Sequence, residues 1–359
     1  MSHLERLRAA LSTVEADAIL VSSEINQRYL TDFHFSDGYI LISHSDAILL
    51  TDSRYIEAAK NTVKDFRPIT ATAGKTMKET LASLIAEQGI TRLAFEDASL
   101  SCAAYRLLDE AFVGCTLLSG GSKLLTSLRS IKTAEELDRM ARAQEITDRA
   151  FSHILSFLSP EVTEREVALE LEFFMRRNGA EACAFSTIAV SGTASSLPHG
   201  VPRDCRLERG LLTMDFGAKV EGYCSDMTRT VCIGTVKEEE RTVYNTVLSA
   251  QRAALEFIAE GVSCREADSV ARSVIEKAGF GANFGHSLGH GVGMLVHESP
   301  SLSPKAPEDS FLKRGNVVTV EPGIYLEGRF GCRIEDMVAI DLDGSVRNFT
   351  KSPKELIEI

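Results

Sequence analysis

Short apolar runs alternate with amphipathic stretches over the first third of the chain. Runs of strand length are DAILVSS from Asp17, GYILIS, DAILLTDS and RLAFED, and the middle two are close enough to pair as neighbouring strands. Between them, RYIEAAKNTV and CAAYRLLDEAF have the apolar spacing of helices, and INQRYLTDF that of a helix or turn. This alternation predicts a small α/β domain with a mostly parallel or mixed sheet, spanning residues 1–128.

The rest of the chain, residues 129–359, contains an internal repeat. EVTEREVALELEFFMRRNGA aligns with GVSCREADSVARSVIEKAGF at a shift of 100 residues, which places Thr163 on Ser263. Each copy opens as a capping box, in which the hydroxyl accepts from an amide of the first turn and a glutamate three residues on reaches back. Each copy ends at a glycine suited to a left-handed C-cap. The matching residues are Glu166 and Glu266, and Gly179 and Gly279.

A second helical stretch precedes each copy of the repeat, and an acidic segment opened by Arg-Gly follows it, at residues 209–210 and 314–315. Two duplicated helix-helix-hairpin halves would bring the acidic hairpins together about a pseudo-two-fold axis. The second domain is therefore predicted to be α+β with an internal repeat. One face of its first helix is traced by Leu137, Met140, Ala143, Ala150, Ile154 and Leu158.

Each acidic segment carries two carboxylates. Asp215 ends the strand LLTMDFG and Asp226 begins the return strand, while Glu321 lies in VVTVEPG, where Pro-Gly ends the strand, and Glu335 lies in RIED. A single aspartate near a turn is ordinarily a cap or an Asx-turn residue, so four independent surface acids are the alternative interpretation. Four acids converging in a core would repel and protonate, a conflict that cations relieve. With His290, they could hold two divalent cations that activate a water, which indicates a hydrolase.

His290 lies in the glycine-rich stretch FGHSLGHGVGMLVHES, between His286 and His297. The spacing of His286 and His290 would suit a helix, but each glycine costs about 1 kcal/mol there, so an extended loop is predicted. His297 is not part of an HExxH zinc-protease motif. The stretch also fits the G-x-S-x-G nucleophile elbow around Ser287, but no strand and acid fit between this serine and the last histidine. Serine catalysis is therefore the weaker hypothesis.

Composition narrows the class of protein. The formal net charge is -12 over 359 residues, with no basic block, which argues against nucleic acid as a partner. The eight cysteines form no CxxC pair, which argues against zinc-ribbon and thioredoxin-like sites and favours reduced core thiols. MSHLERLRAAL lacks the apolar core of a signal peptide, and no later run approaches about 18 apolar residues. We therefore expect no membrane segment and a cytoplasmic location.

In their order and local context, the five candidate ligands resemble those of the pita-bread metallopeptidases, which include the methionine aminopeptidases, aminopeptidase P and prolidase. NQRYLTDF and LLTDSRY are similar to the creatinase/prolidase N-terminal domain, which methionine aminopeptidases lack. LPHGVP, SLGHGVGMLVHE, VEPGIY and RIED resemble the Xaa-Pro peptidase branch. The resemblance covers nearly the whole chain. It implies an α/β N-terminal domain followed by an α+β pita-bread catalytic domain with an internal pseudo-two-fold repeat.

The resemblance also implies a role for each candidate ligand. Asp215 would bind one metal ion, His290 and Glu321 would bind the second, and Asp226 and Glu335 would bridge both. Glu321 would in addition shuttle a proton. Further residues that the resemblance places at the substrate are His199, His297, Arg333 and Tyr325.

These four residues carry more than one interpretation. His297 and His199 match imidazoles that would hold the carbonyl oxygen or the proline carboxyl side, although His199 taken alone is a loop histidine. Arg333 could orient the metal ligands or meet the substrate carboxylate. Tyr325 could line the pocket or pack.

The predicted function is that of a dinuclear-metal exopeptidase, which hydrolyses the Xaa-Pro bond at the N-terminus of dipeptides or short peptides. Carboxylate-rich ligands favour Mn²⁺, and the single imidazole leaves Co²⁺ or Zn²⁺ as alternatives. Similarity to the family also implies a homodimer. The alternative is a non-catalytic pita-bread module that binds peptides, but relatives of that kind lose ligands and this chain retains all five. Some prolidases have arginine where this chain has Ser301, which leaves the preferred peptide length open.

Overall fold

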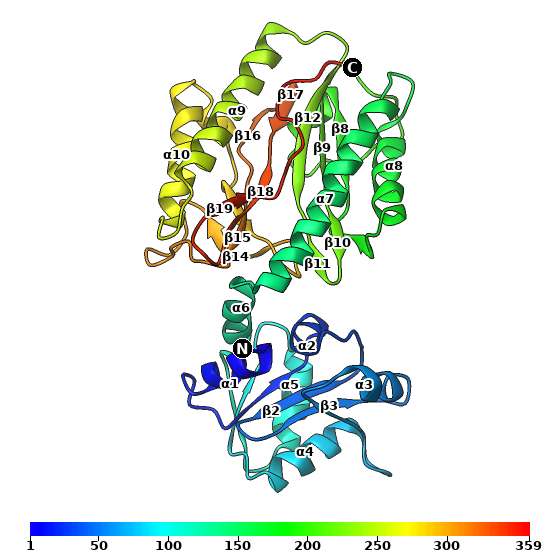
Figure 1. Ribbon diagram of the computed structural model, residues 1–359, viewed down its shortest axis with the longest axis vertical. Coiled ribbons are helices and arrows are strands. Elements are labelled where there is room, and N and C mark those ends of the chain that lie inside the picture. The colour runs from blue at the N-terminus through cyan, green and yellow to red at the C-terminus, as the bar shows by residue number, and fades with distance from the viewer. The chain divides into compact units, whose positions relative to one another are not determined.

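The computed structural model describes residues 1–359, which divide into two compact units, Met1–Arg129 and Ser130–Ile359 (Figure 1). Each unit has its own hydrophobic core. None of the helices combines the length and the apolar character that crossing a membrane requires.

The first unit is built on a six-stranded mixed sheet in the order β4-β3-β2-β1-β5-β6. Strand β2 pairs antiparallel with both β1 and β3, and the other neighbours are parallel. The predicted mixed sheet and the predicted pairing of GYILIS with DAILLTDS are confirmed. The strands are β1 Ala18–Val21, β2 Tyr39–Ser43, β3 Ala47–Thr51, β4 Arg67–Thr70, β5 Arg92–Phe95 and β6 Thr116–Leu118.

Six helices accompany this sheet, including the three predicted ones, which are α2, α3 and α5. Strands β1 and β3 are buried throughout, because a strand covered on both faces has no polar side. Strand β4 was not predicted, since its residues are half-buried to exposed and form no apolar run. The helices are α1 His3–Leu11, α2 Glu24–Thr31, α3 Ile56–Thr62, α4 Met77–Glu87, α5 Cys102–Ala111 and α6 Gly121–Ser130.

The second unit contains the predicted duplication. Helices α7 Ala134–Phe157 and α8 Glu164–Arg177 pack on strands of the first half, and α9 Glu238–Phe257 and α10 Cys264–Lys277 pack on strands of the second half. Figure 1 shows the two helix pairs on opposite sides of the central strands. The predicted apolar face of α7 is buried along its whole length.

One of the two predicted capping boxes forms. Thr163 accepts from the amide of Glu166 at 3.1 Å, and the Glu166 carboxylate accepts from the Thr163 amide at 2.7 Å. Ser263 makes no side-chain cap, so the second box was a wrong prediction. The first amide of each helix donates to a distant carbonyl, that of α8 to Cys205 and that of α10 to Ser310. The glycines behave as predicted, with φ of 109° at Gly179 and 88° at Gly279.

The strands of the second unit form several small sheets. In the first half, β8 and β12 flank β9, and in the second half β15 lies between β13 and β18. Strands β10 and β11 form a hairpin whose turn residues, Glu221 and Gly222, both have positive φ. The first-half strands are β7 Ala182–Cys183, β8 Ile188–Ser191, β9 Gly210–Phe216, β10 Ala218–Val220, β11 Tyr223–Cys224 and β12 Met227–Ile233.

The second-half strands are β13 Gly289–Gly291, β14 Glu298–Leu302, β15 Val317–Val320, β16 Gly323–Leu326, β17 Phe330–Arg333, β18 Asp336–Ile340 and β19 Val346–Asn348. Short 3₁₀ helices cover Gly192–Ser196 and Gly281–Asn283. The C-terminal residues return to the first half, where the amide of Cys232 in β12 donates to the Ile357 carbonyl. The chain end therefore connects the second half of this unit to the first.

Candidate metal centre

The four predicted carboxylates lie at the ends of paired strands. Asp215 is the last residue but one of β9, and Asp226 directly precedes β12, whose Thr228 is the antiparallel partner of Asp215. Glu321 directly follows β15 and Glu335 directly precedes β18, and these two strands are also antiparallel partners. The two hairpins therefore present their acids in equivalent ways, as the duplication requires.

His290 is the central residue of the short strand β13, so the predicted extended conformation is confirmed. The glycines on either side of it allow close approach of other strands. A Cβ atom on Gly289 would lie 2.0 Å from the Thr319 carbonyl oxygen, and one on Gly291 would lie 2.3 Å from the Ser299 carbonyl oxygen. Larger residues at these positions would push β13, and the imidazole with it, away from the acids.

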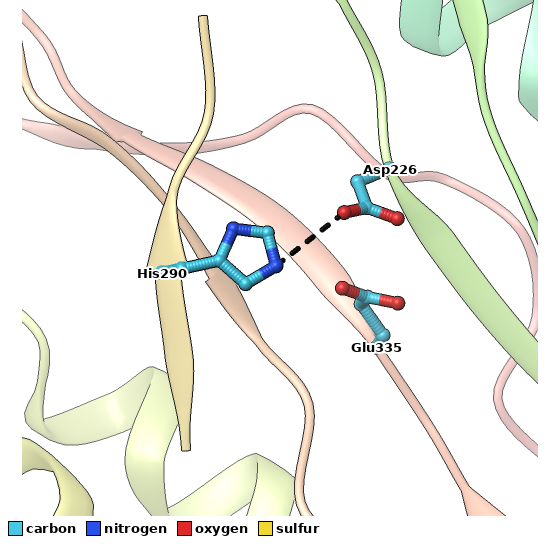
Figure 2. A group of neighbouring side chains, drawn as sticks. All are labelled: Asp226, His290 and Glu335. Atoms are coloured by element: carbon cyan, nitrogen blue, oxygen red, sulfur yellow. Dashed lines mark ion pairs between the residues drawn. The ribbon is translucent and has the colours of Figure 1, made fainter. Parts of the chain in front are cut away.

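Three of the five candidate ligands form a tight cluster. Ligand atoms of Asp226, His290 and Glu335 all lie within 4.8 Å of one another, and their side chains converge from three different strands or strand ends (Figure 2). His290 Nε2 is 3.6 Å from Asp226 Oδ2 and 3.3 Å from Glu321 Oε1. Asp215 lines the same cavity, which has a volume of about 760 Å³.

The electrostatics of this cavity favour added positive charge. Burial raises the pKa of Asp226 and of Glu335 well above their ordinary values, and nearby carboxylates raise both further. Burial also raises the pKa of Asp215, against the lowering effect of Arg333. Burial acts in the same direction on Glu321, but the hydrogen bond with His290 and the charges of His290, His286 and Arg333 together outweigh burial and lower the pKa to about 2. The positively charged side chains of the cavity are therefore too few to neutralise the four acids.

The donor set fits a divalent cation. Asp215 Oδ2 accepts from Arg333 Nη2 at 2.7 Å, whereas Asp215 Oδ1 is buried and has no hydrogen-bond partner. A buried carboxylate oxygen without a partner is costly, and a cation in the cavity would satisfy it. Four carboxylates and one imidazole are ligands suited to Mn²⁺, Co²⁺ or Zn²⁺.

The structure brings the predicted substrate residues to the same cavity. His199, His297, Tyr325 and Arg333 all line it. The ring centroids of His297 and His290 are 4.2 Å apart, and burial followed by the charge of His290 lowers the pKa of His297, which favours its neutral form. The guanidinium of Arg333 is buried and donates to the Tyr325 hydroxyl at 2.8 Å as well as to Asp215.

Two threonines that the sequence analysis did not identify hold the acids in place. Thr228 Oγ1 donates to Glu335 Oε2 at 2.7 Å, and Thr319 Oγ1 donates to Glu321 Oε1 at 3.1 Å. Thr319 also accepts from the amide of His290 at 3.0 Å. The available sequence signal was a polar residue inside an otherwise apolar buried strand, as in VVTV.

Ser287 and His286, in the same glycine-rich stretch, do not form a serine-hydrolase site. The segment after Ser287 is strand β13, whereas a nucleophile elbow leads from a strand into a helix. His286 Nε2 lies 3.0 Å from the Tyr325 hydroxyl, and Nδ1 lies 2.8 Å from the Ser287 carbonyl oxygen. Both ring nitrogens of His286 are thereby engaged, away from the cluster of three ligands.

Comparison with family models agrees with this architecture. Residues 138–341 match metallopeptidase family M24, and residues 3–131 match the creatinase/prolidase N-terminal domain. The predicted fold, an α/β N-terminal domain followed by a pita-bread catalytic domain, is confirmed.

Similar proteins span the full length of the chain. An uncharacterized peptidase of Bacillus subtilis is 43% identical and covers 99% of both chains. The structure of an Xaa-Pro dipeptidase from Bacillus anthracis is 41% identical, with a TM-score of 0.95 and 99% of both chains covered. That of an X-Pro aminopeptidase from Thermotoga maritima is 37% identical, with a TM-score of 0.90, and covers 98% of this chain and all of its own (100%).

Proposed function

The chain belongs to metallopeptidase family M24, and we propose that it is an exopeptidase that hydrolyses the bond between an N-terminal residue and a following proline, using two divalent metal ions. The single observation that carries the proposal is the meeting of four carboxylates and His290 in one cavity, with the buried Asp215 Oδ1 left without a hydrogen bond. The names of the similar Bacillus anthracis and Thermotoga maritima proteins agree with this specificity.

All five proposed ligands line one cavity, and their roles follow from similarity to the family. Asp226 and Glu335, the acids in the cluster with His290, would contribute to holding both ions, as similarity to the family implies. His290 and Glu321 would hold one ion and Asp215 the other. When bound, the ions would supply a nucleophile at neutral pH and polarise the scissile carbonyl.

This chemistry suits an amide that ends in proline. An Xaa-Pro bond has no N–H group for recognition by backbone pairing, and the ring restricts approach to the carbonyl. A site that acts directly on the carbonyl needs neither an N–H group in the scissile bond nor unrestricted approach. The free amino group of the substrate would be held near the carboxylates, which limits cleavage to the first residue of a peptide.

The other residues of the cavity would move protons and hold the substrate. Glu321 lines the cavity beside His290, where it would accept a proton from the attacking water and pass it to the departing proline nitrogen. His297, favoured in its neutral form, and His199 would donate to the carbonyl oxygen or contact the proline carboxyl side. Arg333 holds Asp215, and Tyr325 borders the cavity beside it.

Three finer points belong to the same proposal. The carboxylate-rich ligand set supports Mn²⁺ as the metal, with Co²⁺ or Zn²⁺ as alternatives. A homodimer is proposed from similarity to the family, and light scattering at micromolar concentration would test it. A cytoplasmic location is supported by the eight cysteines, all of which are free thiols.

One assay tests the function directly. Protein loaded with Mn²⁺ is offered Ala-Pro and Ala-Pro-Ala, with Ala-Ala-Ala as the control peptide. We expect release of alanine from at least one proline substrate, loss of activity in EDTA and recovery on adding Mn²⁺. Cleavage of neither proline substrate would contradict the proposal, and cleavage that survives EDTA would show that the reaction needs no metal ion.

A further inference from the structure

The arginine on strand β12 is placed behind the candidate metal centre. Side chains alternate along a strand, so Asp226, Thr228 and Thr230 share one side and Arg229 points to the other. Thr228 reaches Glu335 on the cavity side. Arg229 is 1% exposed and does not line the cavity, and it donates to the main-chain carbonyl of Glu335, which does.

All five N–H donors of the Arg229 guanidinium are used. Nη1 donates to the carbonyl of Glu335 at 2.6 Å and to that of Thr228 at 2.9 Å. Nη2 donates to Asp336 Oδ1 at 2.8 Å. The remaining bonds go to the carbonyls of Ser352, from Nη2 at 2.8 Å, and Pro353, from Nε at 3.0 Å. A fully buried guanidinium with every donor satisfied fixes its surroundings tightly.

These bonds connect the two halves of the catalytic unit at one point. Asp226 belongs to the first half and Glu335 to the second, and strands β12 and β18 lie in different sheets. The main chain joins them beside the site through the amide of Glu335, which donates to the Thr228 carbonyl at 3.1 Å. Arg229 adds the Glu335 carbonyl and the Asp336 carboxylate to this junction, so it holds the peptide that carries Glu335 from behind.

The carboxylate of Asp336, which accepts from Arg229, is also bound through its second oxygen. Asp336 Oδ2 accepts from Lys354 Nζ and from Asn348 Nδ2, each at 2.7 Å. The C-terminal segment that supplies Lys354 is itself tied to helix α7, where Asp148 accepts from the amide and hydroxyl of Ser352. Arg229 thus lies at the centre of a network that joins β12, β18 and the chain end.

We propose that Arg229 is a positioning residue of the metal centre, which sets the separation of Asp226 and Glu335 by anchoring β12 to the Glu335–Asp336 peptide. The inference rests on the proposed function only in requiring that these two acids bind metal. Because two bridging carboxylates must face both ions at once, a small shift between the halves weakens metal binding before it unfolds the protein.

The test is titration of metal-free protein with Mn²⁺ by calorimetry, together with thermal unfolding. In Arg229→Lys, which keeps the charge but cannot make all five bonds, we expect the dissociation constant for Mn²⁺ to rise about 10-fold or more. Asp336→Asn keeps the side-chain shape and should show the same change to a smaller degree. At saturating Mn²⁺, both variants should have a lower kcat with little change in KM.

The matched control is Arg129→Lys, which alters another buried arginine, in the first unit, where it donates to Asn26. Its Mn²⁺ affinity should equal that of the wild type whatever its stability. Unchanged Mn²⁺ binding in both Arg229→Lys and Asp336→Asn would overturn the inference, as would equal weakening in the control. If Arg229→Lys does not fold, Asp336→Asn decides. Wild-type protein that binds no Mn²⁺ would instead overturn the proposed function, and this inference with it.

Discussion

The imidazole of His290 and the carboxylate of Glu321 lie with Nε2 and Oε1 3.3 Å apart, although one comes from the middle of β13 and the other from the residue after β15. Burial lowers the pKa of His290, but Glu321 outweighs this and raises it, while His290 lowers the pKa of Glu321. The contact therefore favours the imidazolium and carboxylate forms of the pair, and a metal ion that binds Nε2 would have to displace the imidazolium proton.

Asp226→Ala should remove both metal ions and leave the fold intact. Asp226 is the acid that faces both His290 and Glu335, so its loss affects each proposed ion. We expect Mn²⁺ content to fall towards zero and turnover of a proline peptide to drop by at least about 100-fold, which corresponds to the several kcal/mol that metal ions supply. Metal analysis and circular dichroism would measure the two effects. Asp204→Ala, on an exposed side chain, is the control, and undiminished turnover in Asp226→Ala would refute the bridging role.

His297→Ala should separate catalysis from metal binding. The His297 ring packs against His290 at 4.2 Å between centroids but is outside the cluster of three ligands. We expect kcat to fall by about 10²–10³-fold, the usual loss for one donor to a developing oxyanion, with Mn²⁺ affinity unchanged. Steady-state kinetics and calorimetry would show this. His153→Ala, on helix α7 outside the cavity, should behave as the wild type. A parallel loss of Mn²⁺ would make His297 a ligand instead.

Arg333→Lys should weaken metal binding through Asp215. Arg333 holds Asp215 Oδ2 and the Tyr325 hydroxyl with two different nitrogens, which a lysine cannot reproduce. We expect Mn²⁺ affinity to fall about 10–100-fold, as for other groups that orient a ligand. Arg329→Lys alters an exposed arginine of the same hairpin and serves as the control. Equal affinities in the two variants would show that Asp215 does not depend on Arg333.

Glu164 should stabilise the catalytic unit in a pH-dependent way. This fully buried carboxylate accepts from the amide and hydroxyl of Ser191 and from three nitrogens of Arg203. Burial raises the pKa of Glu164, but these bonds outweigh burial and lower it below its ordinary 4.5. Glu164→Gln should reduce the free energy of unfolding by about 1.5–3 kcal/mol at neutral pH, as expected for bonds to a charged group.

The sign of the pH effect follows from the lowered pKa of Glu164. Stabilisation by the ionised group is complete above the unfolded-state pKa and disappears as pH falls through the lower folded-state pKa. The difference between wild type and Glu164→Gln should therefore be constant near neutral pH and shrink as the pH falls below the ordinary 4.5, measured by urea unfolding. Glu161→Gln, at an exposed glutamate, should show no such difference. A difference that is constant with pH would contradict the assigned ion pair.

Local patterns were sufficient to predict much of this molecule. The apolar face of α7, the capping box of Thr163 with Glu166 and the positive φ of Gly179 all depend on residues within a few positions of each other. Helix caps and turns are determined by residues that are this close in sequence. The Ser263 cap, predicted from the same local pattern, does not form.

The ordered set of acids and His290 was readable along the chain because each acid flanks an apolar strand and the imidazole sits between glycines. What the sequence could not determine is which side chains support them. Arg229 and Asp336 are 107 residues apart, and their contact exists only because the two halves pack against each other. Thr228 likewise reaches Glu335 across that junction. The periodicity of a strand specifies on which of its faces a side chain lies. Only the packing of the two halves determines which residues that face contacts.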